Sequence, residues 1–472
     1  YVLKVSYLGY ITQLVPLQVT SQNKRMDDVV LQPDAILLAE AVVTGQAPQV
    51  QVVEDTIQFN SSAYRTQKGA VLEDLVEKLP GAEIDDSGNV KINGKDISKV
   101  MVNGQEFFGG DVSTALKNLP VEMIDKLKTY DKKSDLARIT GIDDGEEETV
   151  LDLTVKKEMN TGWFGNVDGA IGTKDRYSTR AMVNYFRGPT QVSLIGSINN
   201  VNDQGFYGGG GGPRWNRNNG LTAKKWVGID FFTKTDKIEL GGSARYNYTG
   251  SDVASIGSTE DFLTSGNSFS NSNSNAMNRS KNFNADFRME WRPDTLTNII
   301  FRPNVSYSKT DNYSLSETGT FNSDPYNLVD NPNDYLNLEK LTMDDDPLED
   351  IRINAINSGS LTDGKDLSAN GTLQINRKLS PDGRNITFRG RFSYGDNVNR
   401  QYTESQTNYF LLESYLGGDS ILIRNQYIHT PTKDFNYRAQ LTYSEPIAKA
   451  TYLQFSYQFQ YMYSESDRKT YD

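Results

Sequence analysis

Hydrophobic and polar side chains alternate along most of the chain beyond residue 160. In TYLQFSYQFQYMY, residues 451–463, the odd positions from 453 onward hold leucine, phenylalanine and tyrosine, whereas the even positions from 454 to 460 hold glutamine and serine. Residues 238–248, 283–291 and 367–376 repeat the scheme. Because successive side chains of a strand point to opposite faces, each stretch predicts a β-strand with one apolar, aromatic face and one polar face.

The links between these strands alternate in length. We expect about eleven strands of roughly ten residues each, the length that crosses a bilayer at a tilt. Short links follow every second strand, at residues 187–190, 233–236, 292–295, 380–383 and 446–449. Long polar links are expected at residues 202–220, 268–280, 314–365 and 397–433. Tight turns at one end and long loops at the other predict a transmembrane antiparallel β-barrel in the outer membrane of a Gram-negative bacterium, with extracellular loops.

A soluble β-sandwich also has alternating strands and is the structural alternative. Sandwich cores favour valine, isoleucine and leucine. Here aromatic residues gather towards strand ends, as at Tyr246, Trp291 and Tyr443, where the aromatic girdle of a barrel would lie. The opposite face carries charges in mid-strand, among them Asp286 and Arg288, which suits a water-filled interior. The pattern therefore favours the barrel.

The chain divides into four predicted parts. Residues 1–33 are interpreted as the C-terminal remnant of a β-sandwich domain, and residues 34–61 as an extended connector. Residues 62–159 form a small α/β domain that could plug a large lumen, and residues 160–472 form the barrel. The predicted fold class is therefore mostly β. Since an odd number of strands leaves a single-chain barrel open, we expect the polypeptide to continue beyond its last residue, with about half of a large barrel present.

Turn and helix signals subdivide the α/β domain. Residues 71–79 have helical hydrophobic spacing and are followed by Pro80-Gly81. Asn93-Gly94 and Asn103-Gly104 are dipeptides typical of tight turns. Asp111 is expected to cap a second helix.

Composition excludes several classes of function. The 472 residues contain no cysteine and one histidine, which argues against thiolate or imidazole catalysis and metal binding. The net charge of −12 argues against a nucleic-acid partner. An enzyme is therefore not expected, and no cofactor is expected either.

The segment LEDLVEKLPGAEIDDSGNVKINGKDISKVMVNGQEFFGGD, residues 72–111, resembles the plug domain of TonB-dependent receptors, in the form common among large glycan and nutrient receptors. The resemblance is carried by Leu79-Pro80-Gly81, by the two Asn-Gly turns and by Phe107 to Asp111. Residues 1–10 and 37–45 are similar to the end of a carboxypeptidase-regulatory-like domain and the connector that precedes such plugs.

The resemblance implies a transporter that imports a glycan or another large solute through a plugged barrel. It implies outer-membrane lipid, TonB in the periplasm and a surface lipoprotein as partners. No TonB-binding segment stands out, and Val42–Val53 is where we would expect one. The alternative is a non-transporting barrel that serves as a structural or assembly subunit of a larger outer-membrane complex.

Two sets of candidate site residues follow from the predicted faces and loops. Six arginines are expected to face the lumen and to pair with plug carboxylates such as Asp85, Asp86 or Glu146–Glu148. They are Arg245, Arg288, Arg302, Arg389, Arg391 and Arg438. Five loop aromatics could stack on sugar rings. They are Phe206, Tyr207, Trp215, Tyr326 and Tyr335. The acidic stretch 344–350, in an expected extracellular loop, could bind calcium.

Overall fold

The structure is a computed structural model of the chain. It describes residues 1–7, 10–18, 25–33, 48–85, 89–202, 220–262, 266–337, 346–413, 419–448 and 451–472. Tyr1–Ala47 forms one compact unit and Pro48–Asp472 another. In the first unit, β1 (Val2–Val5) and β2 (Gln13–Pro16) pair as an antiparallel hairpin.

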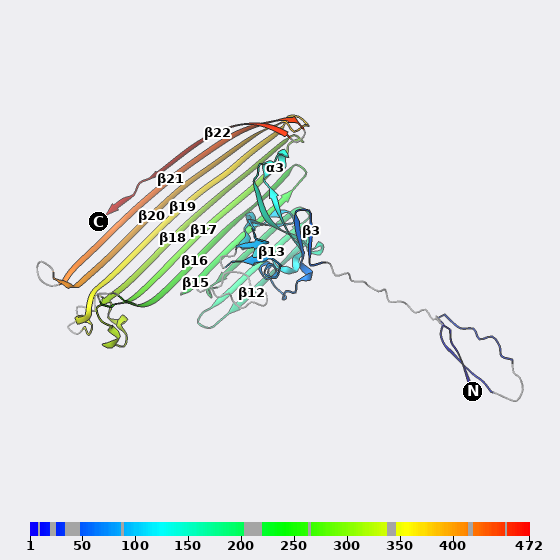
Figure 1. Cartoon of the computed structure of the whole chain (residues 1–472), viewed down its shortest axis with the longest axis horizontal. Helices are drawn as coiled ribbons and strands as arrows, with labels where there is room; N and C mark the ends of the chain where they lie inside the picture. Colours follow the sequence, from blue (N-terminus) through cyan, green and yellow to red (C-terminus); the bar gives the residue numbers. More distant parts are fainter. Residues whose placement is uncertain are drawn as a thin grey trace. The chain divides into compact units, whose positions relative to one another are not determined.

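The second unit begins with a small α/β domain (Figure 1). Its main sheet has the order β3-β4-β10-β11-β8-β9, and a smaller sheet has the order β5-β6-β7. The strands are β3 (Val50–Val53), β4 (Thr56–Asn60), β5 (Ala82–Ile84), β6 (Val90–Ile92), β7 (Lys95–Asp96), β8 (Lys99–Val102), β9 (Gln105–Glu106), β10 (Ile124–Lys133) and β11 (Glu147–Val155). The helices are α1 (Leu72–Val76), α2 (Val112–Asn118) and α3 (Asp135–Thr140).

Local signals explain most of these elements. Asn93 and Asn103 have φ of 51°, and Gly94 and Gly104 after them have φ of 78°. Two consecutive residues with positive φ make the turn that joins two-residue hairpins, which confirms both predicted turns. Asp111 caps α2 by accepting a hydrogen bond from the Thr114 N–H, as predicted (2.6 Å).

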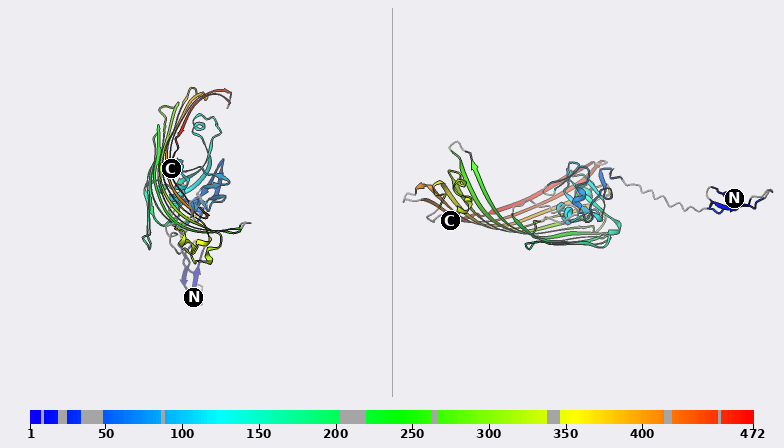
Figure 2. Two further views of the ribbon diagram at one scale, coloured as in Figure 1. Left: turned by 90° about the vertical axis from the view of Figure 1, so that its left-hand side faces the viewer. Right: turned by 90° about the horizontal axis from the view of Figure 1, so that it is seen from below.

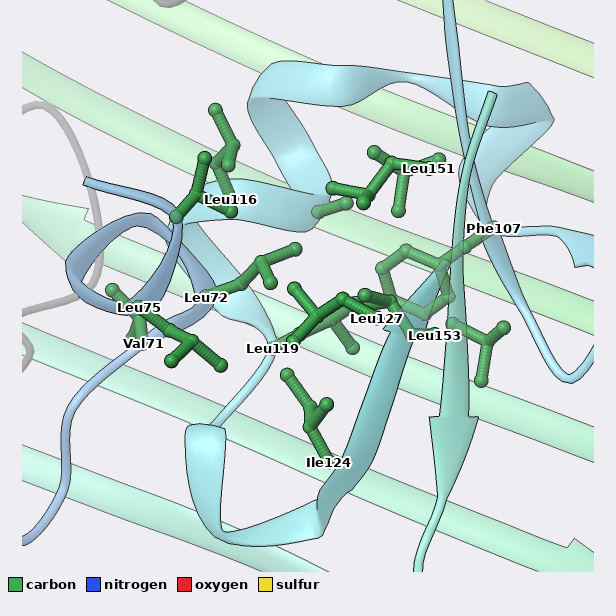
Figure 3. Packing of buried hydrophobic residues seen from close by; sticks show 14 of the residues in the cluster. Val71, Leu72, Leu75, Phe107, Leu116, Leu119, Ile124, Leu127, Leu151 and Leu153 are labelled. Carbon is green, nitrogen blue, oxygen red and sulfur yellow. The ribbon is translucent and has the colours of Figure 1, made fainter. Parts of the chain in front are cut away.

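The core of the small domain lies between its helices and its main sheet (Figure 3). Leucines of α1 and of the α2 region pack against leucines of β10 and β11, and all are fully buried or nearly so. The set includes Leu72, Leu75, Leu116, Leu119, Leu127, Leu151 and Leu153. β3 and β4 belong to this domain because β4 pairs with β10, although both strands fall within the range assigned to the connector. The sheet thus begins earlier than the predicted boundary at residue 61.

The remainder of the chain forms one antiparallel sheet, which confirms the predicted fold class of a mostly β protein with a small α/β domain. Its strands follow sequence order from β12 to β22. They are β12 (Thr161–Ile171), β13 (Tyr177–Arg187), β14 (Thr190–Asn199), β15 (Leu221–Lys234), β16 (Ile238–Asp261), β17 (Ser268–Trp291), β18 (Thr297–Phe321), β19 (Arg352–Lys378), β20 (Asn385–Glu413), β21 (Asp419–Ala448) and β22 (Thr451–Ser466), with β23 (Lys469–Tyr471) beside β21. The sheet is curved, and the small domain lies against its concave side (Figure 2).

The register aligns apolar side chains of neighbouring strands into continuous rows. Val227, Tyr246, Phe283, Tyr307 and Leu367 are paired one after the other across β15 to β19. We call the face that carries this row the outward face, and the opposite face, which holds the small domain, the inward face. The outward face is open to solvent along the whole sheet: Trp163 of β12 is 74% exposed and Phe455 of β22 is 61% exposed.

The strands are much longer than predicted. β16 and β17 have 24 residues each and β21 has 30. Residues 268–280, expected to be a loop, lie within β17, and the predicted loop 397–433 is mostly strand. Residues 268–280 and 397–408 are mostly polar on both faces, and Ile421–Ile423 is apolar on both. These segments therefore lack the alternation by which a half-buried strand is identified, yet they form the same backbone ladder. Four of the five short turns occur close to where they are predicted, at residues 187–190, 233–236, 292–295 and 380–383. Of the fifth, residues 446–448 belong to β21 and residue 449 lies outside the described residues.

Candidate functional site

The small domain meets the inward face through the loop from Phe107 to Asp111. Phe108, Gly109 and Gly110 have φ of 47°, 66° and 84°. Positive φ is costly for a phenylalanine and easy for glycine, so this sequence can form a tight, left-handed projection. A Cβ on Gly109 would lie 2.9 Å from Oδ1 of Asp286, on β17. The glycine therefore lets the loop backbone approach the sheet closely.

Phe108 is the apolar anchor of this loop. Its side chain is fully buried, and its ring centroid lies 6.1 Å from that of Trp226 on β15. A Cβ on Gly228 would lie 2.7 Å from Cε1 of the Phe108 ring, so the ring occupies the space above that glycine. The Phe108 N–H donates to Oδ2 of Asp230 at 3.0 Å. Ring and backbone are thus held by the same strand.

Asp111 connects the loop to β16. Besides capping α2, its carboxylate accepts a hydrogen bond from Nη1 of Arg245 at 2.5 Å. Burial alone would raise the pKa of Asp111, but the Thr114 N–H and the Arg245 guanidinium hold the pKa below its ordinary value. The carboxylate is therefore charged at neutral pH.

A network of charges occupies the inward face beside this loop. Glu290 on β17, whose side chain is 1% exposed, pairs with Arg138 of α3 at 2.7 Å and with Arg288 and Arg292 at 2.8 Å each. Asn298 donates to the same carboxylate at 2.7 Å. Three guanidinium groups around one carboxylate satisfy the bonding requirement of a charge that would be very costly to bury alone.

Asp135 and Glu106 bring the negative charges of the small domain into this network. Asp135 lies 2.6 Å from Nη2 of Arg302 and 3.5 Å from that of Arg288. Glu106 lies 3.5 Å from Lys132 and 3.6 Å from Lys99. In both carboxyls burial acts to raise the pKa, but the surrounding cations prevail and lower it. The network is therefore ionised at neutral pH.

Local folding positions the residues of α3. Ser134 caps the helix by accepting a hydrogen bond from the Ala137 N–H at 3.0 Å, and Gly141 ends it with a φ of 73°. Asp135 and Arg138, three residues apart, consequently project from one side of a single turn and pair with each other at 3.3 Å. This helix was not predicted from the sequence, although a serine precedes it and a glycine follows it.

Two cavities flank the loop. One, of about 230 Å³, is lined by charged side chains that include Glu106, Asp135, Arg138 and Glu290. A more open one, of about 730 Å³, lies on the other side and is lined by Asp111, Arg245, Asn284, Asn304 and others. Both are polar, so the interface between the small domain and the charged strands has room for water.

The register places all six candidate arginines on the inward face. Arg245, Arg288 and Arg302 contact the small domain, but their partners are Asp111, Asp135 and Glu106 rather than those expected. The expected partner Glu148 instead pairs with Lys99, within the small domain (2.7 Å).

The other three arginines lie on β20 and β21. Arg391 is paired in register with Arg438, and Arg438 donates to Oε1 of Gln460 on β22 at 3.0 Å. Arg389 precedes them on β20 and is paired in register with Gln374. These three side chains share the inward face with the contacts of the small domain, on strands farther along the sheet.

The loop aromatics are divided between described and undescribed segments. Phe206, Tyr207 and Trp215 lie outside the described residues. Tyr326 is 48% exposed, and its hydroxyl accepts a hydrogen bond from Asn271. Tyr335 is half-buried against a small cluster formed by Phe321, Leu336 and Leu348. Only part of its ring surface is therefore accessible to a ligand.

The acidic stretch 344–350 is the candidate for a calcium site. Where the structure describes this stretch, Asp346 pairs with the buried Arg352 at 2.7 Å. Among the described residues there is no group of three or more acidic or imidazole side chains that could hold a metal ion. The structure also describes no helix long and apolar enough to cross a membrane.

Sequence reasoning missed an apolar patch on the inward face. Met182 and Phe186 of β13 and Ile195 of β14 are buried in one cluster with the core of the small domain, and Phe164 and Trp226 pack against it. The signal was present in YSTRAMVNYFR, residues 177–187, in which both sets of alternate positions carry large apolar side chains. A strand apolar on both faces indicates that both faces are covered.

No protein-family model matches the chain, and no curated protein sequence does. Solved structures do match. The ferric yersiniabactin uptake receptor FyuA from Yersinia pestis is 11% identical over 88% of this chain and 72% of that one, with a TM-score of 0.26. The ferric preacinetobactin receptor BauA from Acinetobacter baumannii is 10% identical over 88% and 60%, with a TM-score of 0.33. The RagAB peptide transporter is 9% identical over 88% and 58%, with a TM-score of 0.37. The chain thus spans less than two thirds of the length of the last two.

Proposed function

We propose that this chain forms the plug and part of the wall of an outer-membrane transporter of the TonB-dependent-receptor kind. The observation that carries the proposal is the outward face. Its apolar rows run in register across the large sheet and have no protein partner among the described residues. Apolar surface is unfavourable in water by roughly 25 cal/mol per Å², and hydrocarbon is the solvent that such a face suits.

The height of the apolar surface supports this placement. On β17 the outward positions are apolar from Phe283 to Trp291, and on β18 from Ile299 to Tyr307. Each stretch matches the roughly 9–11 residues with which a tilted strand crosses a bilayer. β17 has 24 residues, which at about 3.3 Å per residue gives about 80 Å. The strands therefore continue well beyond the membrane.

The inward face beyond the small domain suits a neutral polar solute such as a glycan. On β17 to β19 it presents hydroxyl and amide groups with few charges. The set includes Ser280, Asn282, Ser306, Ser308, Thr310, Ser368 and Asn370. These groups donate and accept hydrogen bonds, as sugar hydroxyls do. We infer that a solute captured between the long strands passes along this surface to the plug.

The strand pairing suggests how a pull from the periplasmic side would open the plug. The chain enters the small domain at β3, which pairs with β4, and β4 pairs with β10 from Ile57↔Thr129 to Asn60↔Lys126. β10 leads directly to α3, whose Asp135 and Arg138 bind the wall. A force on the segment before β3 would therefore reach the charged contacts through two backbone ladders.

The test is to remove the segment that would be pulled and to leave the folded domain intact. Residues 36–47 are deleted in one variant and replaced by a Gly/Ser linker of equal length in another. Both variants retain β3. Growth on a panel of purified glycans as sole carbon source and the amount of protein in the outer membrane are measured for both. We expect uptake to be lost while the protein level is unchanged.

The linker variant separates recognition of the segment from its length. Uptake lost in both variants indicates that the segment itself is bound and pulled. Wild-type growth in both variants, at an unchanged protein level, would contradict the importer and favour the structural subunit. Recovery of the wild-type protein in the soluble fraction would contradict the membrane placement itself.

A further inference from the structure

One row of four lysines and a tyrosine crosses the outward face at the edge of its apolar surface. Lys225 on β15, Tyr248 on β16, Lys281 on β17, Lys309 on β18 and Lys365 on β19 are paired one after the other in register. We call these five residues the lysine row. With neighbouring strands about 4.8 Å apart, the row extends over about 19 Å. It lies two residues beyond the apolar row from Val227 to Leu367.

This arrangement is costly for the protein alone. Like charges directly opposite each other on neighbouring strands destabilise a sheet, and Lys281, Lys309 and Lys365 form such a run of three. Lys309 lies 3.1 Å from Asp311 and 3.6 Å from Asp363. In the part of the chain that the structure describes, no ion pair involves Lys225, Lys281 or Lys365, and all three are exposed.

The next row outward does not provide the missing negative charge. It contains Arg279, Asp311, Asp363 and Arg400 in register. Arg279 already pairs with Asp252 at 2.6 Å, and Arg400 lies 3.9 Å from Asp363. Cations therefore outnumber carboxylates in this region of a chain whose net charge is −12.

The same boundary on the following strands has a different pattern. In register, the lysine row continues to Val398 on β20 and Pro431 on β21, which carry no charge. Asp396, Lys433 and Glu465 continue the apolar row instead, and the sign of their charge alternates from strand to strand. A general collar of membrane-edge lysines would continue around the sheet. The lysine row is instead confined to β15–β19, which is expected of a discrete binding site.

We propose that the lysine row binds the phosphate groups of an acidic lipid in the outer leaflet, a phosphorylated glycolipid whose acyl chains lie along the apolar row beneath. Tyr246, Phe283 and Tyr307 supply the aromatic surface at the level of the acyl chains. Lys281, Lys309 and Lys365 supply the charge, and lysines near a charged membrane surface attract acidic headgroups. This inference rests on the proposed membrane placement of the sheet.

The test compares two triple variants of the full-length protein purified in detergent. Lys281→Gln/Lys309→Gln/Lys365→Gln removes three charges from the row. Lys237→Gln/Lys378→Gln/Arg384→Gln removes three charges at the short-turn end of the strands and is the matched control. Retention of diphosphorylated lipid A is measured by native mass spectrometry, and thermal unfolding is measured with and without the lipid. The probes also include dephosphorylated lipid A and inorganic phosphate.

We expect the row variant to retain diphosphorylated lipid A at least tenfold less tightly, since each lysine accounts for about fivefold. The control variant should bind it like the wild type, and dephosphorylated lipid A should not distinguish the three proteins. Without lipid, the row variant should unfold at about the same temperature as the wild type, because relief of the repulsion among the lysines offsets loss of the partly exposed Lys309 pairs with Asp311 and Asp363. This measurement separates loss of the site from loss of the fold.

Equal retention of phosphorylated lipid by the wild type and the row variant would overturn the proposal. So would a site that inorganic phosphate fills and lipid A does not, because the ligand would then be a free anion. Recovery of the wild type in the soluble fraction would overturn the membrane placement and this inference together. Loss of lipid binding with unchanged fractionation supports the site independently of transport.

Discussion

The small domain contacts two stretches of the same sheet in two different ways. Against β13–β15 the contact is apolar, with Met182, Phe186 and Ile195 buried in one cluster with the core of the small domain. Against β16–β18 it is made of charges, with Asp111 on Arg245 and Asp135 on Arg302. Polar cavities border the charged contact. The contact with β13–β15 therefore excludes water, whereas the contact with β16–β18 lies next to cavities that can hold water.

The difference suggests an order of release. Separating the apolar contact exposes hydrocarbon to water, which is unfavourable at every pH and salt concentration. Separating the charged contact lets both partners recover their hydration, which offsets much of the attraction that is lost. We therefore expect the small domain to detach first from β16–β18 and to remain attached to β13–β15. Hydrogen exchange that opens α3 before the Phe107–Asp111 loop would agree with this order.

The largest expected effect is on the apolar side. Phe108→Ala removes a fully buried ring from the space above Gly228. Such truncations cost about 3–5 kcal/mol, and we expect the free energy of local opening of α2 to fall by that amount. Hydrogen exchange of α2 measures it. Phe108→Leu, which retains most of the apolar volume, should lose clearly less. Wild-type protection of α2 in Phe108→Ala would mean that packing above Gly228 contributes little.

The next effect is on the charged side. Glu290→Gln leaves Arg138, Arg288 and Arg292 gathered around a neutral amide. Breaking a fully buried ion pair by removing one partner costs about 3–5 kcal/mol. We expect about 1–3 kcal/mol here, because Arg138 still pairs with Asp135, and Arg288 and Arg292 still pair with Glu239. We expect α3 to lose hydrogen-exchange protection while Phe108 remains buried. Simultaneous loss of protection at the contacts with β13–β15 and with β16–β18 would show that they open as one unit. It would contradict the distinction between them.

The sequence predicts the sheet well where one face differs from the other. Alternation found the stretches around Phe283–Trp291 and Phe455–Tyr463 and assigned Arg245 and Arg288 to the polar face. It failed at residues 268–280 and 397–408, where both faces are mostly polar, and at Ile421–Ile423, where both are apolar. Hydrophobic and polar residues alternate only where the two faces of a strand have different surroundings. A strand with water on both sides shows no such alternation. The backbone ladder that extends these strands leaves no trace in such a pattern.

The kind of contact in the candidate site could be predicted from the sequence, but the individual partners could not. The arginines were expected to meet carboxylates of the small domain, and three do, but neither Asp135 nor Glu106 was identified. The arginines of the sheet that they contact, Arg288 and Arg302, lie about 150 residues or more farther along the chain. The pairing therefore depends on how the small domain docks against the sheet. The apolar patch at Met182 and Phe186 was within reach, because a strand apolar on both faces marks a covered surface.

Acid should loosen the charged stretch selectively. The pKa values of Asp135, Asp111 and Glu106 are lowered in the folded protein, so the unfolded state binds more protons as the pH falls. Their contribution is complete above the ordinary carboxyl pKa of about 4 and is lost as the pH falls through the lowered values. We expect no change between pH 7 and about pH 5, and faster exchange of α3 below about pH 4.

The control for the acid effect is Asp135→Asn, which removes one of the titrating groups. Exchange rates are corrected for the intrinsic rate at each pH. The variant should already be less protected at pH 7 and should show a weaker dependence on pH than the wild type. An equal loss of protection at β13–β15 and at α3 in acid would contradict the distinction between an apolar and a charged contact.

The smallest effect is expected from an ion pair that has good geometry but lies outside the contact. Arg384 donates to both carboxylate oxygens of Glu445, at 2.7 and 2.5 Å, on an exposed part of the sheet near a short turn. Solvent screens such a pair, and water replaces it readily when it is broken. Arg384→Gln should therefore leave the exchange of α2 and α3 unchanged. A loss of protection similar to that of Glu290→Gln would mean that the total charge of the sheet, rather than burial against the small domain, sets the strength of the contact.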